Sequence, residues 1–500
     1  MLFLGIDAGT TSLKAGLFDE RGNTHAIVNE EYSLVTSTAD QAELDPEDYW
    51  RACVNGVRRV LANANARREE IIGIGVSSQG ETTIAVAANG RPLRHALVWL
   101  DNRAADQARQ IAERFDLKRV YAITGDPEIV ATWTACKILW LKQNEPDVFS
   151  RAHKFILVED FLLHRLTGRF ATDGAVSCTS MLWDIQRGGW WDEMLAFIGI
   201  SGERLSEPVL PGSIVGQLTR GAANELGLLP NVQVIACGMD QASGAIGAGN
   251  RAPGMISEST GAALAIQATV PASNLDATGR LPVYVHDVRD TFLFVPVCNT
   301  GGMALRWFRD QFGQGEMRVA REQHRDAYDL LGEMAARIAP GCEGLTLLPH
   351  LMGAFSPEYN MDARGVFYGF TLRHTKAHFA RAILESIAFM LKRNLDLMQS
   401  LGVPVRQVRS TGGGAKSPLW LQIKADVLGV PVVTLEQEDT AVLGDAILAA
   451  MACGAHKTLA AACEAMVRVR GRIEPNVTTR SVYDDAFARY VAVYDRLFAT

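Results

Sequence analysis

The chain lacks any run of basic residues, and its charge balance is acidic. Its 500 residues include 49 Lys and Arg against 56 Asp and Glu, which gives a net charge of −7. Even the pair Arg67-Arg68 is followed at once by Glu69-Glu70. A surface of this sign repels phosphate-rich polymers and anionic lipid. We therefore expect neither nucleic acid nor a membrane among its partners.

Long hydrophobic runs and paired cysteines are absent as well. Nowhere do about 18 apolar residues stand together, the length that a membrane-spanning helix needs. The N-terminus has no basic leader, and Asp7 interrupts its apolar stretch, so we expect no secretory signal. The eight cysteines include no C-x-x-C pair, which indicates reduced, buried thiols, and the ten histidines do not cluster at metal-ligand spacing. These features predict a cytoplasmic protein without a structural metal.

Low-complexity segments and long linkers are also missing, so the whole chain is expected to fold. Its length predicts about two to four domains. Helix-like segments, such as 46–63 and 133–144, alternate with strand-like segments, which indicates a mixed α/β fold. Residues 254–266 repeat the pattern of residues 4–18, two strand-like runs around a tip of glycine and hydroxyl residues. This echo predicts two similar lobes that meet near residues 245–252.

The most informative segment is 4–18, which reads as a β-hairpin. Its tip, Gly9-Thr10-Thr11-Ser12, exposes backbone amides and hydroxyls, and Lys14 adds a cation. Such a tip suits a polyphosphate, whose oxygens accept from these donors. Asp7, at the end of the first strand, is placed to reach a hydrated Mg²⁺ carried by the same phosphates. An ordinary hairpin with an incidental acid is the alternative.

A second acid follows an apolar strand in segment 234–245. Asp240 would lie at a helix N-terminus, where the helix dipole favours the charged carboxylate. A carboxylate there can accept the proton of an alcohol that attacks a γ-phosphoryl group, and Gln241 lies beside it. The alternative is that Asp240 only caps the helix.

Three further segments place polar or small residues at strand ends. Residues 411–420 contain three adjacent glycines, which let the backbone approach a ligand closely, although a plain strand-to-helix turn explains them equally well. Their spacing does not match a P-loop. At the ends of two earlier strands, the side chains that could bind the hydroxyls of a polyol or stack on its carbon face are Gln79, Glu81, Trp99, Asp101 and Arg103. A solvated loop is the competing interpretation of each.

The most specific stretch is Gly-Val-Phe-Tyr-Gly-Phe at 365–370, followed by His-Phe-Ala-Arg-Ala-Ile-Leu-Glu at 378–385. It resembles the C-terminal signature of the FGGY family of carbohydrate kinases, with a mild departure at Phe370. The family's other blocks are matched in order by the segments 7–11, 238–241, 260–261 and 412–415. The N-terminal signature around Thr134, Lys137 and Trp140 is partial, because Thr132 replaces an aromatic or small residue.

The resemblance implies a fold of two ribonuclease-H-like lobes, as in the actin and hexokinase ATPases, around a central nucleotide cleft. Residues 1–247 would form the N-terminal lobe with the phosphate hairpin and sugar site, and residues 248–500 the nucleotide-binding C-terminal lobe. ATP and Mg²⁺ would be the cofactors, with Asp240 as general base and with Asp7 and Asp240 on the metal side. The nucleotide and its phosphates would be held by Gly9, Thr10, Thr11, Ser12, Lys14, Thr260, Gly261, Gly302, Gly413, Gly414 and Ala415.

The implied activity is phosphorylation of a small sugar or polyol. Segment 78–83 is similar to a block of glycerol kinases, but Gly80 replaces the arginine of that block, and Thr132, outside it, replaces a tyrosine of the glycerol kinases. Loss of two large side chains enlarges the pocket and removes hydrogen bonds that a three-carbon polyol needs. Segments 362–367 and 415–420 are similar to xylulose kinases, which favours a ketopentose such as D-xylulose. The alternatives are a glycerol or tetritol kinase, and an ATPase or sugar sensor on the same fold. The oligomeric state stays open, a homodimer included.

Overall fold

The computed structural model describes residues 1–273 and 275–498, and the chain forms two units built from discontinuous segments. Unit 1 consists of Met1–Ala252, Thr269–Leu293 and Asp439–Arg468. Unit 2 consists of Pro253–Ala268, Phe294–Glu438 and Val469–Thr500. The sequence predicts one boundary, between residues 247 and 248. Unit 1 also includes segments that lie beyond this boundary in the chain, and the division into two domains stays a prediction.

A six-stranded sheet forms the centre of unit 1. Its order is β13 (Ile214–Gln217), β14 (Gln233–Met239), β5 (Ile71–Ser78), β1 (Leu2–Ala8), β2 (Ser12–Asp19) and β3 (Thr24–Glu31). β1 pairs antiparallel with β2, which confirms the predicted first hairpin. β5 runs parallel to both β1 and β14, so the carboxyl ends of these three strands meet at one edge of the sheet.

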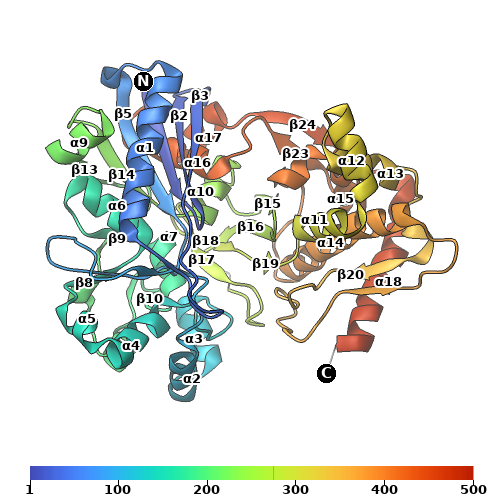
Figure 1. Ribbon diagram of the computed structural model, residues 1–500, viewed down its shortest axis with the longest axis horizontal. Coiled ribbons are helices and arrows are strands. Elements are labelled where there is room, and N and C mark those ends of the chain that lie inside the picture. Colours follow the sequence, from blue (N-terminus) through green and yellow to red (C-terminus); the bar gives the residue numbers. More distant parts are fainter. Residues whose placement is uncertain (274, 499–500) are drawn as a thin grey trace. The chain divides into compact units, whose positions relative to one another are not determined.

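Helices cover both faces of this sheet (Figure 1). Leu4 and Ile6 of β1 belong to a core that includes residues of α1 (Pro46–Ala64) and α6 (Val158–Thr167). Phe3 belongs to a second core with α16 (Thr440–Ala452). Gly5 lets α16 come close, because an added Cβ would lie 1.9 Å from the carbonyl oxygen of Val442. Side chains alternate along a strand, so Asp7 shares the α16 face with Phe3 and Gly5.

The capping residues at the start of α1 explain where this helix begins. Asp45 caps α1 by accepting from the Glu47 amide, and Pro46 occupies the first turn, as predicted. The helix expected at 133–144 begins at Thr134, with Trp133 as N-cap. The other helices of unit 1 are α2 (Ala105–Arg114), α3 (Leu117–Thr124), α4 (Thr134–Asn144), α5 (Pro146–Arg151), α7 (Gly174–Ser177), α8 (Asp192–Ile198), α9 (Arg220–Leu226), α10 (Asp240–Gly247) and α17 (Leu459–Met466).

Short strands complete unit 1. They are β4 (Glu43–Leu44), β6 (Ile84–Val86), β7 (Ala96–Leu97), β8 (Lys154–Ile156), β9 (Ala171–Asp173), β10 (Trp183–Asp184), β11 (Gly189–Trp190), β12 (Glu207–Val209) and β17 (Val283–Val285). All eight cysteines are free, and all are buried except the partly exposed Cys453, which confirms the expected thiols. Within the described ranges, no helix has the length and apolar character that crossing a membrane requires.

Unit 2 is also built on a sheet. β15 (Ile256–Thr260) pairs antiparallel with β16 (Leu264–Pro271), which confirms the second hairpin. On its other side, β15 runs parallel to β22 (Val408–Thr411), followed by β23 (Val432–Leu435) and the antiparallel β24 (Val469–Ile473). The remaining strands of unit 2 are β19 (Val297–Cys298), β20 (Thr346–Leu348) and β21 (Val366–Tyr368). β18 (Thr291–Phe294), most of whose residues belong to unit 1, lies next to β16 in the same sheet.

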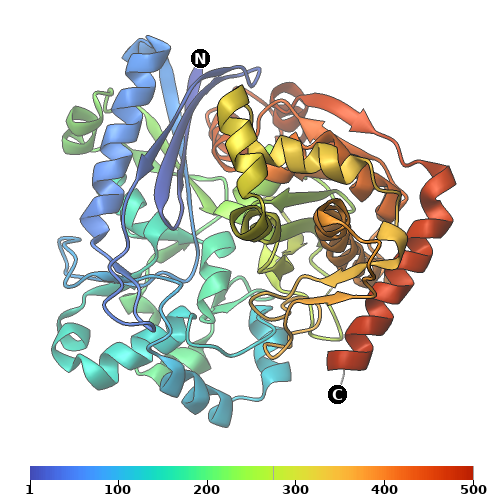
Figure 2. The ribbon, with the colours of Figure 1, turned by 45° about the vertical axis from the view of Figure 1, so that its right-hand side comes forward.

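The helices of unit 2 pack against this sheet and against one another. They are α11 (Gly302–Phe312), α12 (Gln314–Gln323), α13 (Ala327–Ala336), α14 (Lys376–Ser400), α15 (Pro418–Leu428) and α18 (Arg480–Phe498). α18 is the long red helix in Figure 2. His378 accepts a hydrogen bond from the Thr375 amide at the start of α14, as expected of a capping residue.

Candidate active site

The turn between β1 and β2 is the predicted phosphate hairpin. The Gly9 amide donates to the Ser12 carbonyl at 3.0 Å, which closes the turn. Thr10 Oγ1 accepts a hydrogen bond from Trp99 Nε1 at 2.8 Å. A residue predicted to bind phosphate is therefore in contact with a residue predicted to bind the sugar. Thr11 is exposed at the tip. Lys14 lies opposite Asp7 in the ladder, and its Nζ is 2.5 Å from Asp439 Oδ1.

Asp7 and Asp240 are brought to the same edge of the sheet by strand register. Asp7 pairs with Ser77 of β5, and Met239, which precedes Asp240, pairs with Ser78. Asp240 is the first residue of α10, and the N-cap position belongs to Met239. Asp240 therefore lies in the first turn, where the helix dipole favours a carboxylate.

A third carboxyl, Asp445 of α16, completes this acidic group. Ser77 Oγ donates to Asp445 Oδ2 at 3.0 Å, and Ser243 Oγ donates to Oδ1 at 2.6 Å. The sequence analysis missed Asp445, although a lone acid in the apolar segment 442–450 was a usable signal. Burial, the charge of Asp7 and the charge of Asp240 together hold its pKa well above the usual range.

Burial also raises the pKa values of Asp7, the predicted metal-side carboxyl, and of Asp240, the predicted general base. The pKa of Asp7 is raised to about 7 by burial and then by the charge of Asp240, against the lowering effect of Lys14. The pKa of Asp240 is raised to about 7 by burial and by Glu81, against hydrogen bonds from Gln241. A pKa near neutrality suits a general base, because the group must be deprotonated before the reaction and must still be basic enough to accept a proton during it.

The same group has the chemistry to approach a hard cation. Asp7 Oδ1 is buried and has no hydrogen-bond partner within the described residues. In that part of the chain, no group of three or more His, Cys, Asp or Glu side chains is arranged to hold a metal. Mg²⁺ usually binds through one or two carboxylates together with waters and substrate phosphates. The residues present therefore fit a cation that arrives with a nucleotide rather than one held in a protein cage.

Glu81 lies beside the acidic group and is anchored through its backbone. Its carbonyl accepts from Lys137 Nζ at 3.1 Å and from Thr134 Oγ1 at 3.1 Å, and its φ of 56° is left-handed. Burial raises the pKa of Glu81 to about 7 and lowers that of Lys137 to about 7. Asp126 is a further buried acid near Glu81, and both of its carboxyl oxygens have no partner among the described residues. Sequence reasoning did not find Asp126.

Three side chains predicted to bind the sugar form hydrogen bonds with other parts of the protein. Gln79 Nε2 donates to Tyr49 Oη at 2.9 Å and to Thr82 Oγ1 at 3.1 Å. Asp101 is fully buried and accepts from Arg103 at 2.8 and 2.7 Å. These contacts hold Gln79, Asp101 and Arg103 in place, and their part in sugar binding stays a prediction, whereas Glu81 and Gln241 keep partly exposed side chains beside Asp240.

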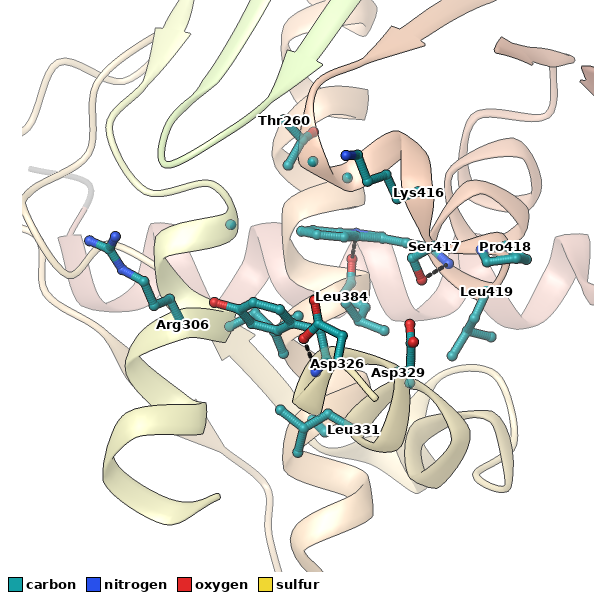
Figure 3. Close-up of a pocket in the computed structure, with 18 of the residues that line it drawn as sticks. Thr260, Arg306, Asp326, Asp329, Leu331, Leu384, Lys416, Ser417, Pro418 and Leu419 are labelled. Carbon is teal, nitrogen blue, oxygen red and sulfur yellow. Dashed lines mark hydrogen bonds between the residues drawn. The ribbon is translucent and has the colours of Figure 1, made fainter. Parts of the chain in front are cut away.

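A cavity of about 660 Å³ lies within unit 2 (Figure 3). Figure 3 shows Thr260 and Lys416 on one side of it and Asp326, Asp329 and Leu331 on the other. Of the six residues of unit 2 that were expected to hold the nucleotide, five line this cavity: Thr260, Gly261, Gly302, Gly413 and Gly414. The other, Ala415, packs in a small core with Leu421, Ala425 and Val432.

The two glycine turns of this cavity are tightly packed against each other. An added Cβ on Gly414 would lie 2.7 Å from the Cβ of Thr260, and one on Gly302 would lie 2.6 Å from the Gly261 carbonyl oxygen. The glycine run is therefore needed for close approach of the backbone. The opposite wall, from α11 and α13, carries Arg306, Tyr328 and Asp329, which no sequence motif indicated.

Comparison with known proteins agrees with this architecture. A model of the N-terminal domain of the FGGY family of carbohydrate kinases matches residues 2–247, and a model of the C-terminal domain matches residues 254–453. A xylulose kinase from Staphylococcus epidermidis is 31% identical over 493 residues, 98% of this chain and 96% of the relative. A gluconokinase from Bacillus subtilis is 31% identical over 452 residues, 90% of this chain and 87% of the relative.

Among solved structures, that of a ligand-bound xylulose kinase from Lactobacillus acidophilus superimposes with a TM-score of 0.90 at 25% identity. It covers 100% of this chain and 99% of the other. The expected two-lobed ATPase fold and the expected resemblance are thus confirmed. The chain belongs to the FGGY family of carbohydrate kinases, phosphotransferases that act on a small sugar substrate and use ATP, generally with Mg²⁺.

Proposed function

We propose that this protein transfers the γ-phosphoryl group of ATP to a hydroxyl of a ketopentose, with D-xylulose the first candidate. The observation that carries the proposal is the acidic group at one sheet edge of unit 1, where Asp240 and Asp7 lie together with raised pKa values. The xylulose kinase relative, matched over 98% of this chain, supports the choice of acceptor.

In this proposal, Asp240 is the general base. Its carboxylate takes the proton of the acceptor hydroxyl as that oxygen bonds to the γ-phosphorus, and the bond from phosphorus to the β,γ-bridging oxygen breaks to release ADP. The amides of the Gly9–Ser12 turn and the Lys14 ammonium stabilise charge on the phosphoryl oxygens. Mg²⁺, when bound with the nucleotide, neutralises phosphate charge, and Asp7 and Asp240 would hold it.

The acceptor would lie beside Glu81 and Gln241, with Trp99 against its carbon face. Trp99 is oriented for this by its bonds to Thr10 and Thr82. Gly80 has no space for a larger side chain, because an added Cβ would lie 2.4 Å from Thr179 Oγ1. A large polar side chain that could bind glycerol therefore does not fit at this position, which favours an acceptor longer than glycerol.

An aldonate is the second candidate, because the gluconokinase relative is equally identical. Its carboxylate would have to lie near three further acids, Glu81, Asp126 and Glu128. Burial raises the pKa of each of them, and the charges of Glu81 and Glu128 raise the pKa of Asp126 further. Like charges in a poorly solvated region repel strongly. This favours a neutral sugar over gluconate.

The test is a screen of acceptors with a coupled assay of ADP release in the presence of Mg²⁺. D-Xylulose, D-ribulose, glycerol, erythritol and D-gluconate are compared at equal enzyme concentration. We expect a ketopentose to give a kcat/KM at least ~10-fold above the other classes, since a few lost hydrogen bonds produce such ratios. A higher value for gluconate or glycerol would refute the acceptor. ADP release that no sugar accelerates would refute the kinase mechanism.

A further inference from the structure

A fully buried ion pair lies behind the cavity of unit 2. Lys424 Nζ of α15 is 2.6 Å from Glu258 Oε1 of β15, and both side chains are 0% exposed. Ser410 of β22 also donates to Glu258 Oε1. A buried ion pair costs desolvation of both charges and is weak evidence of a stabilising role. Its presence here therefore requires another explanation.

The pair is connected directly to Thr260, which lines the cavity. Thr260 Oγ1 donates to Glu258 Oε2 at 2.7 Å and accepts from Lys424 Nζ at 2.9 Å. A hydroxyl has one hydrogen to donate, and that hydrogen is taken by Glu258. The side chain of Thr260 therefore fixes the turn that begins with Gly261.

Lys424 also reaches the other two parts of the cavity wall. Its Nζ lies 5.3 Å from the centroid of the Trp420 ring, which lines the cavity. An added Cβ on Gly414 would lie 3.4 Å from the same Nζ. One ammonium group thus contacts Thr260 and the Trp420 ring and lies close to the glycine turn.

We propose that Lys424 and Glu258 are positioning residues for nucleotide binding, which hold the Thr260–Gly261 turn and the Gly412–Gly414 turn at the spacing that a nucleotide polyphosphate requires. This rests on the proposed function, because it takes the cavity to be the nucleotide site. Neither side chain touches the ligand. The pair acts through Thr260 and through the backbone of the two turns.

The competing explanation is that the ion pair only stabilises unit 2. Comparing a single with a double substitution distinguishes this explanation from the positioning role. Lys424→Met leaves Glu258 as an isolated buried charge, which destabilises a fold whatever the role of the pair. Glu258→Leu combined with Lys424→Met removes both charges, and such replacements are often neutral or stabilising. The double variant is therefore expected to recover the melting temperature but not the geometry of Thr260.

The experiment measures ADP binding by calorimetry without sugar, together with melting temperature and steady-state kinetics. We expect the double variant to melt within a few degrees of the parent but to bind ADP at least ~10-fold more weakly. The KM for ATP should rise by a similar factor, while the KM for the sugar stays within ~2-fold. Glu258→Gln, which keeps the shape and a hydrogen-bond acceptor, should lose less than the double variant. Arg393→Met is the matched control, because it breaks the Arg393–Glu358 pair of unit 2, outside the cavity.

Full recovery of ADP affinity in the double variant would overturn the proposal and leave the pair a purely structural role. An equal loss of affinity in Arg393→Met would overturn it too, because the effect would then be general. If the double variant does not fold, Glu258→Gln decides: unchanged ADP affinity refutes the positioning role, and a loss of at least ~3-fold supports it. Failure of the parent protein to bind ADP would refute the proposed function instead.

Discussion

Asp240→Asn should abolish turnover and, at alkaline pH, stabilise the fold. Asparagine cannot accept the hydroxyl proton, and a positioned general base contributes ~10²- to 10⁴-fold. We therefore expect kcat to fall by at least ~10²-fold. The affinity for ADP without Mg²⁺ should stay within ~3-fold, because Asp240 does not line the cavity of unit 2 and its proposed contact with the nucleotide is through Mg²⁺.

The stability effect follows from the raised pKa of Asp240, about 7 in the fold against 3.8 as the reference value. Below the lower value the carboxyl is protonated in both states. Between the two values the unfolded chain releases the proton and the fold retains it, so the free energy of unfolding falls as the pH rises. Above about pH 7 the decrease ends. Asparagine has no such dependence, so the gain from the substitution grows from about pH 4 to about pH 7.

The size of the gain follows from the shift. Three pKa units correspond to about 4 kcal/mol. Asp240 is partly exposed and shares its site with Asp7, so solvent screening and proton sharing reduce this, and we expect about 1 to 2 kcal/mol. For a unit of this size, that is a rise in melting temperature of roughly 1.5 to 3 °C.

The assay is thermal unfolding of parent and variant at pH 5, 6, 7 and 8, beside initial rates with MgATP and the sugar. Asp106→Asn serves as the control, since that carboxylate is exposed on α2. A melting-temperature gain that is equal at all four pH values, or largest at pH 5, would contradict the linkage argument. A kcat within ~10-fold of the parent would remove Asp240 from its role as base.

Three further changes test neighbouring parts of the site. Gly414→Val should weaken ADP binding at least ~10-fold by calorimetry, because its Cβ would lie 2.7 Å from that of Thr260; unchanged binding would remove the need for close approach. Lys137→Met should lower stability by about 2 kcal/mol in denaturant titration, since it leaves the buried Val98 and Glu81 carbonyls without that donor, at 2.9 and 3.1 Å; an unaffected midpoint would contradict this. Glu81→Gln should raise the sugar KM about 10-fold and leave the KM for ATP unchanged, and a reversed pattern in steady-state kinetics would place Glu81 on the nucleotide side.

Much of the local structure could be predicted from the sequence, because its causes lie within a few residues. The hairpins at β1–β2 and β15–β16 follow from alternating apolar runs around glycine and hydroxyl tips. The start of α1 follows from Asp45 and Pro46. The family blocks named most of the cavity's glycines, because close backbone approach permits few other residues. The family blocks named Ala415 together with these glycines, but only the structure shows that its side chain packs in a small core.

The contacts between distant segments could not be predicted in this way. Asp445 joins Asp7 only because α16 returns from residue 440 to pack on β1, where Gly5 admits it. Lys424 and Glu258 are 166 positions apart, and the parallel pairing of β15 with β22 brings their elements together. By itself, the sequence determined which strands and turns form, since these depend on local periodicity and backbone freedom. Only the tertiary structure decided which charges share a buried site, because burial and charge proximity depend on the packing of segments far apart in the chain.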